Sequence, residues 1–214
     1  MSDLPVDPWA AILVGHQWPG SSALATLSAA ASSRHSVGAA FHGYADALRS
    51  VSDTVLSDQH GATAESIRAS FRTGEGHARG IADRNTAKKA ALDRAHRCVS
   101  ELRAALAEIA DRGTRQIHSI QDGSESAAVK IAAIVAVVQA AQTDADTRAA
   151  LCLQDVYGSI QTVLDTCGHD SSARQFADTH GVGQRALHSA PHPDGVHERV
   201  QEMVDEHSST DLDR

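Results

Sequence analysis

The sequence predicts an all-α protein in which an elongated antiparallel helical hairpin is extended to a four-helix bundle. One observation is a stripe from Ile67 to Ile120 whose steps alternate between four and three residues, with no proline inside it. A second is that aromatic residues make up only 3% of the chain, while much of its apolar share is alanine, which suits close helix packing. A third is that no convincing period-two run, the pattern of a strand, is present. The stripe consists of Ile67, Phe71, Gly74, Ala78, Ile81, Asn85, Lys88, Leu92, Ala95, Val99, Leu102, Leu106, Ile109, Gly113, Gln116 and Ile120.

Composition divides the 214 residues into three parts. Residues 1–20 form an irregular arm that contains Trp9 and Trp18 and is broken by prolines. Residues 21–167 form the helical bundle domain. Residues 168–214, rich in glycine, proline, histidine and acid, are expected to be a mostly disordered acidic tail with one short helix from Val196 to Glu206. The two tryptophans indicate that the arm packs into a groove, either as a hydrophobic plug or as a recognition motif.

The first long helix is expected to begin at Ser21 or Ser22, either of which can cap it, and to end near Ser57. Asp58 to Gly61 then form a polar turn closed by glycine. Side chains on the two sides of this turn should pack together, since the turn reverses the chain. The expected pairs bring three residues of the first helix against two of the second: Leu48, Val51 and Val55 against Ile67 and Phe71.

The second helix is expected to begin near Thr63, with Glu65 in its first turn, and to continue through the stripe. Gly74, Gly76 and Gly80 lie inside it, and each costs about 1 kcal/mol relative to alanine. These glycines indicate either a place where another helix approaches closely or a bend. We therefore expect a kink there, or two helices in tandem.

Two further helices are expected, from Ser126 to Gln142 and from Asp144 to Thr166. The first contains the apolar run Ile131–Val138 and is apolar on every side. Such a helix is either buried among others or in contact with a membrane. Because a membrane span needs about 20 such residues, and Lys130 and Gln139 flank this run closely, the buried position is favoured.

No enzyme is predicted, because no pattern of a catalytic, cofactor-binding or metal site is found. The three cysteines, Cys98, Cys152 and Cys167, show no C-x-x-C or zinc spacing, so they are expected to be small core residues, and a disulfide between two of them is left open. His188, His192 and His197 lie within ten residues, but prolines flank His192 and no helix face presents the three together. The net charge of −8 makes nucleic acid a poor partner.

Two segments resemble a known family. WPGSSALATLSAAASSRHSVGAAFHGYADALRSV resembles the start of the N-terminal helical domains of actinobacterial type VII secretion effectors, in which a W-P motif precedes an alanine-rich helix. LSDQHGATAESIRASF resembles the hairpin turn of the WXG family, with Gly61 and Phe71 at matching positions. Gln59 stands where that turn has its tryptophan. The family's export signal, a tyrosine followed four positions later by an acid, does not occur, because Leu48 follows Tyr44 and Gln161 follows Tyr157 at that spacing.

The resemblance implies a non-enzymatic protein associated with type VII secretion, which acts by helix–helix packing with a helical-hairpin partner. Trp9 would anchor the arm, Trp18 and Gly20 would be motif positions, and Gly61 and Phe71 would shape the hairpin. The acidic first residues, MSDLPVDPWAAILVG, carry no secretory signal, so export would follow a route independent of a signal peptide. The alternative is a cytoplasmic coiled-coil scaffold or regulator that self-associates.

Overall fold

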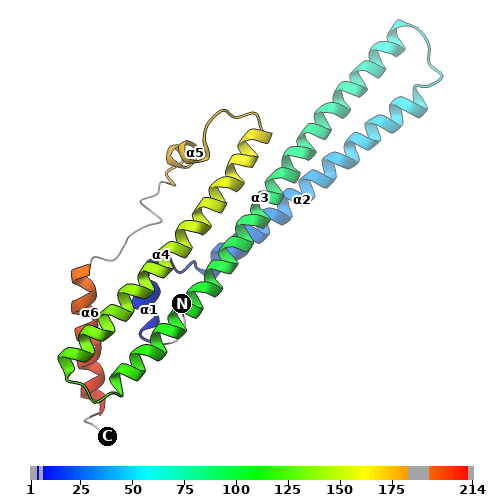
Figure 1. The fold of residues 1–214 in the computed structure, drawn as a ribbon. Helices are drawn as coiled ribbons and strands as arrows, with labels where there is room; N and C mark the ends of the chain where they lie inside the picture. Colours follow the sequence, from blue (N-terminus) through cyan, green and yellow to red (C-terminus); the bar gives the residue numbers. More distant parts are fainter. Residues whose placement is uncertain (1–3, 5–6, 183–192, 212–214) are drawn as a thin grey trace. The chain divides into compact units, whose positions relative to one another are not determined.

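The computed structural model describes Leu4, residues 7–182 and residues 193–211, and every regular element among them is helical. The all-α prediction is therefore confirmed. The elements in chain order are α1 (Ala10–Val14), the 3₁₀ turn η1 (Gly15–Gln17), α2 (Ser21–Ser50), the π-helical turn η2 (Val51–Val55), α3 (Ala62–Gln121), α4 (Ala127–Thr166), α5 (Ala173–Thr179) and α6 (Pro193–Asp211). Figure 1 shows their course along the chain.

The chain divides into two compact units, which are described separately. The arm unit comprises Met1–Ala23, Cys98–Asp155 and Arg174–Arg214. The hairpin unit comprises Leu24–Arg97 and Val156–Ala173. Helices α3 and α4 contribute residues to both units. The three-part division by composition stays a prediction.

In the hairpin unit, α2 and the first part of α3 lie side by side and run in opposite directions (Figure 1). The register follows from cross-helix contacts, since Arg79 binds Asp46 whereas Glu75, one turn earlier, binds Arg49. An alanine Cβ at Gly74 would lie 3.3 Å from Leu48 Cδ1, so this glycine marks a close approach of α2. The antiparallel hairpin predicted around Gly61 is thus present.

The buried positions along the seam of the hairpin unit are mostly small side chains. Alanine needs little room, so two helices can approach closely, but each alanine also removes little apolar area from water. Leu164, at the α4 end of the unit, is the one large apolar side chain that is buried among the described residues of this unit. The buried residues of the unit are Ala31, Gly38, Ala45, Ser52, Ala64, Ala78, Ala82, Asn85, Ala95, Ser159, Leu164 and Ala173.

The arm unit has a core of large side chains. The short helix α1 inserts into it, with Leu13 completely buried and Trp9 only 5% exposed. The second part of α3, the first part of α4 and α6 supply the other walls. The core consists of Trp9, Ala10, Leu13, Val14, Leu106, Ile109, Ala110, Ile117, Ile131, Ile134, Val138, Ala141, Ala145, Val196 and Val200.

The structure corrects two predicted helix boundaries. Helix α4 is continuous from Ala127 to Thr166, so the predicted break between Gln142 and Asp144 is wrong. No glycine or proline occurs before Gly158 to end it, and the Thr143 hydroxyl bonds to the carbonyl of Gln139 one turn back. Helix α3 is likewise one element of 60 residues, not two in tandem.

The region beyond residue 167 holds more helix than the single short one expected. Helix α5 is present, and α6 spans Pro193–Asp211 where Val196–Glu206 was expected. Val196 and Val200 are buried in the core of the arm unit, so this face of α6 is part of a folded domain. Residues 183–192 and 212–214 of the expected tail lie outside the described residues.

Gly113 tests how tightly the arm packs on α3. A Cβ at this position would lie 2.6 Å from Leu13 Cδ2 and 3.3 Å from Leu13 Cγ, and Leu13 has no free space to move into because it is fully buried. Overpacking of this kind costs about 1–3 kcal/mol, against a gain in helix propensity of about 1 kcal/mol. We expect Gly113→Ala to lower the free energy of unfolding, measured by urea titration with circular dichroism.

The matched control is Gly76→Ala in the same helix, because Gly76 is exposed and a Cβ there would meet nothing within 4 Å. This control should gain up to about 1 kcal/mol from helix propensity. If the two alanine variants were stabilised equally, Leu13 would not occupy the space in front of Gly113.

Candidate functional site

The arm that contains Trp9 and Trp18 makes its contacts within its own unit. The Asp7 carboxylate accepts a hydrogen bond of 2.8 Å from the Trp9 amide at the start of α1. The indole of Trp18 lies under the Arg103 guanidinium, 4.8 Å from the ring centroid, and Arg103 Nη1 donates a 2.6 Å hydrogen bond to the carbonyl of Pro19. Of the two roles left open for the arm, the contacts of Trp9 favour the hydrophobic plug.

The hairpin turn is held by a glycine and an arginine. Gly61 has φ +103°, a conformation that side-chain-bearing residues rarely adopt. Arg68 Nε and Nη2 both donate to the carbonyl of Leu56, at 3.1 and 2.8 Å, and Nη2 also donates to the carbonyl of Gln59. Arg68 was not singled out from the sequence, because nothing in the pattern reveals a side chain that reaches back across the turn.

Large apolar side chains remain exposed in the hairpin unit. Val55 is 65% exposed, Tyr44 is 56% exposed and Ile67 is 41% exposed. The predicted packing of Val55 against Ile67 is therefore at best partial, whereas Leu48 does lie against α3 at Gly74. Phe71 is half-buried. Val55 and Ile67 lie within six residues of Gly61, one on each side. The end of the hairpin at the turn therefore has a hydrogen-bonded backbone beside two exposed apolar side chains.

The predicted site residues fall into two sets. Trp9, Trp18 and Gly20 belong to the arm unit, and Gly61 and Phe71 belong to the hairpin unit. The roles assigned to these five residues in binding a partner stay predictions. The exposed apolar side chains of the hairpin unit form the candidate interaction surface.

Four charged residues connect α2 to α3 in the hairpin unit. Glu75 Oε1 lies 3.0 Å from Arg79 Nε and 2.5 Å from Arg49 Nη2, and Arg79 Nη2 lies 3.0 Å from Asp46 Oδ1. Hydrogen bonds from Arg79 and then from Arg49 hold the pKa of Glu75 below its ordinary value, against a smaller opposing effect of burial. Glu75 is the centre of this network, since it receives both arginines.

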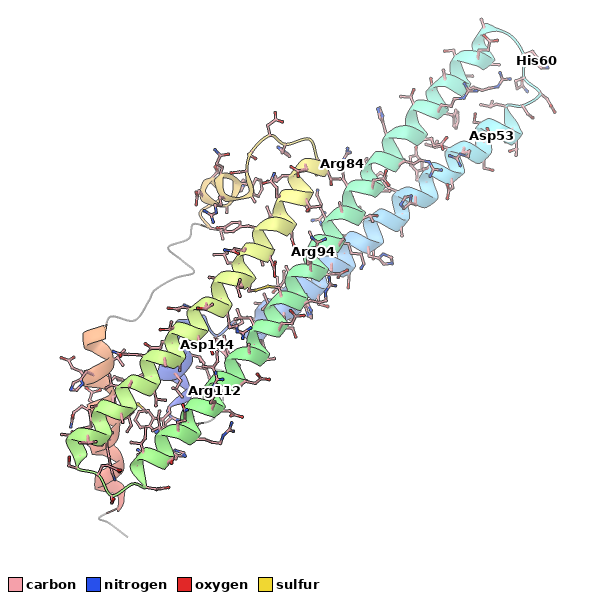
Figure 2. All side chains as sticks on the ribbon, viewed as in Figure 1. Asp53, His60, Arg84, Arg94, Arg112 and Asp144 are labelled. Carbon is pink, nitrogen blue, oxygen red and sulfur yellow. A yellow bond between two sulfur atoms is a disulfide. The ribbon has the colours of Figure 1, made fainter. Side chains whose placement is uncertain are left out.

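A disulfide joins the two long helices of the arm unit. Cys98 of α3 and Cys152 of α4 are bonded, with their Cα atoms 5.6 Å apart, and Cys167 is free and partly exposed. Cys98 and Cys152 were expected to be small core residues, and both are indeed buried, with 9% of each exposed. Their pairing could not be read from the sequence because it depends on the register of α3 against α4. In the same unit, Arg112 and Asp144 form a 2.9 Å ion pair (Figure 2).

Within the described part of the chain, no group of three or more histidine, cysteine, aspartate or glutamate side chains is arranged to hold a metal ion. His188 and His192 lie outside the described residues.

Helix α4 is the one described helix that is long and apolar enough to cross a membrane. Three residues of its apolar run, Ile131, Ile134 and Val138, lie in the core of the arm unit.

Comparison with known proteins identifies a distant relative and no family. No family model matches the chain, and no solved structure matches it. The chain is similar to the uncharacterized protein Rv2082 of Mycobacterium tuberculosis, with 30% identity over 187 residues. The match covers 84% of this chain but only 24% of the mycobacterial protein, so the chain spans about a quarter of that relative's length.

The Glu75 network predicts a pH dependence of the hairpin unit. Because the folded-state pKa of Glu75 lies below its ordinary value of 4.5, its contribution to stability is present above pH 4.5 and is lost as the pH falls through the lowered value. We expect Glu75→Gln to lower the free energy of unfolding at neutral pH and to flatten its pH dependence below pH 4.5. Urea titrations across this range provide the measurement.

The control is Glu108→Gln, since Glu108 is an exposed carboxylate of the same helix and forms no ion pair among the described residues. Its pH dependence should match that of the parent protein. Equal behaviour of the two variants would show that Glu75 does not carry the effect.

Proposed function

We propose that this chain is a non-enzymatic helical protein associated with type VII secretion, and that its hairpin unit packs against a helical protein partner. The partner's apolar helix face would cover side chains that the chain itself leaves in water. Complexes of this kind resemble a domain core divided between two chains. Recognition would depend on shape and apolar area and not on a chemical reaction.

The observation that carries the proposal is the contrast between the two units. In the arm unit the stripe of α3 meets large side chains from three other elements, and Leu106 and Ile117 are fully buried. In the hairpin unit the buried residues that meet the same helix are mainly small, and Tyr44, Val55 and Ile67 are exposed. Exposed large apolar side chains also occur in the arm unit, so the contrast lies in the buried seam and not in the number of exposed residues. A partner helix that covered these three side chains would add apolar burial to a unit whose own seam buries little apolar area.

The disulfide supports a location outside the reducing cytoplasm. Structural disulfides persist in oxidising compartments and are rare in cytosolic proteins. Closing the 54-residue separation between Cys98 and Cys152 is worth about 4 kcal/mol in the chain-entropy treatment. Together with the resemblance to the helical domains of type VII secretion effectors, this favours export over residence in the cytoplasm.

The alternative, a cytoplasmic scaffold that self-associates through the α3 stripe, has weaker support. Leu106 and Ile109 of that stripe already lie in a core that α1, α4 and α6 of the same chain share. A second copy would have to use the hairpin unit or the outer faces of the helices. Replacing Leu106 with a charged residue would therefore test folding and not association.

The proposal is tested by expressing the tagged chain in a mycobacterial host and measuring it in culture filtrate and cell lysate, with and without the type VII secretion ATPase. We expect ATPase-dependent appearance in the filtrate. Tyr44→Glu combined with Ile67→Glu should reduce export while leaving helicity unchanged, because both side chains are exposed and contribute little to folding.

The matched control is Val129→Glu, since Val129 is also an exposed apolar residue, at 54%, but belongs to the arm unit. It should be exported like the parent chain. Filtrate levels that are independent of the ATPase, or no export at all, would contradict the link to secretion. Equal export of the two glutamate variants would contradict the assignment of the partner surface to the hairpin unit.

A further inference from the structure

A groove of about 410 Å³ lies between α2 and α3 in the hairpin unit, and eight of its nine lining residues are polar or charged. Its α2 side presents three serines spaced four residues apart, Ser28, Ser32 and Ser36, together with His35. Four residues per step keeps the three hydroxyl groups on one helix face. Its α3 side presents Lys89, Asp93, His96 and Arg97, again within two helical turns. The groove therefore gathers hydrogen-bonding groups on an otherwise alanine-rich seam.

The charge of the groove favours an anion. Lys89 Nζ lies 2.5 Å from Asp93 Oδ2, so these two charges neutralise each other. Asp93 is the one carboxylate among the lining residues. Arg97 is exposed and forms no ion pair with any residue that the structure describes. The net charge that the groove offers is therefore the positive charge of Arg97, on a chain whose overall charge is −8.

The hydrogen-bonding groups match the same class of ligand. A guanidinium donates two parallel hydrogen bonds to an oxyanion, and imidazole and hydroxyl groups add further donors. Among the described residues, the side chains of His35, His96, Ser28 and Ser32 take part in no hydrogen bond or ion pair with another residue. The Ser36 hydroxyl donates to the carbonyl of Ser32 and retains its oxygen as an acceptor. Donors that converge on one groove without protein partners are available to a ligand.

We propose that this groove binds a phosphate monoester, with Arg97 as the principal anion-binding group and with the side chains of His35, His96, Ser28 and Ser32 as neighbouring donors. Such a group carries close to two negative charges at neutral pH and three acceptor oxygens, which matches one guanidinium surrounded by imidazole and hydroxyl donors. The volume fits a small phosphorylated molecule or a phosphomonoester headgroup at a vesicle surface. The proposal is independent of the role in secretion, because it needs no partner protein.

The test follows the histidine C2 proton resonances of the full chain by nuclear magnetic resonance. His35 and His96 are assigned through His35→Gln and His96→Gln, and the probes are inorganic phosphate and glycerol 3-phosphate. We expect saturable shifts that are confined to these two histidines. Arg97→Gln should weaken binding about tenfold, as expected for loss of one charged hydrogen-bonding group.

The matched control is Arg94→Gln, one turn earlier in the same helix, because the exposed Arg94 is not among the residues that line the groove. It should change the affinity by less than about twofold, since it alters only the long-range charge. A second arm measures flotation with phosphatidylcholine vesicles with and without phosphatidic acid. Flotation that depends on both phosphatidic acid and Arg97 identifies a lipid headgroup as the source, and binding of the soluble probes alone identifies a free metabolite.

Three outcomes would overturn the proposal. One is the absence of saturable shifts with either soluble probe together with no Arg97-dependent flotation. Another is equal weakening by Arg97→Gln and Arg94→Gln, which would show non-specific attraction to a basic helix face. The third is a shift of histidines throughout the chain and not of His35 and His96 in particular. Circular dichroism of each variant checks that the hairpin remains folded.

Discussion

The structure depends on the covering of one apolar stripe along a single helix. Helix α3 has 60 residues, which corresponds to about 90 Å of helix, and an isolated helix of that kind would leave its stripe in water. The two units cover the stripe with different kinds of side chain. Large side chains from α1, α4 and α6 cover the stripe in the arm unit, and a seam of alanine and glycine covers it in the hairpin unit.

This difference has a direct energetic consequence. Burial of a large aliphatic side chain contributes about 1.5–3 kcal/mol, whereas an alanine methyl contributes about 0.8 kcal/mol. The hairpin unit therefore gains less from its own seam than the arm unit gains from its core. Its cross-helix ion pairs, centred on Glu75, and the Arg68 contacts at the turn fix the register and geometry of the hairpin more than they add stability, since solvent screens exposed ion pairs. A partner that covers Tyr44, Val55 and Ile67 would add the missing burial.

The sequence was sufficient for features that depend on local periodicity. The stripe predicted α3, the polar turn ending at Gly61 predicted the hairpin, and the alanine content predicted helices in place of strands. Features that depend on the meeting of distant residues were not predictable. The insertion of Leu13 against Gly113, the bond between Cys98 and Cys152 and the Arg103 contact with Trp18 each join segments more than fifty residues apart. The break expected within α4 was wrong, because the Gln142–Asp144 segment contains no glycine or proline that would end the helix.

Native-state hydrogen exchange tests the central claim most directly, because it measures the opening free energy of each helix within one molecule. If the two units differ as described, the amides of Leu106–Ile117 should exchange only through global unfolding, while those of α2 and of Ala62–Arg97 should exchange through openings of lower free energy. Equal protection along the whole of α3 would contradict this account, since it would show that the alanine seam holds the helix as firmly as the core of large side chains.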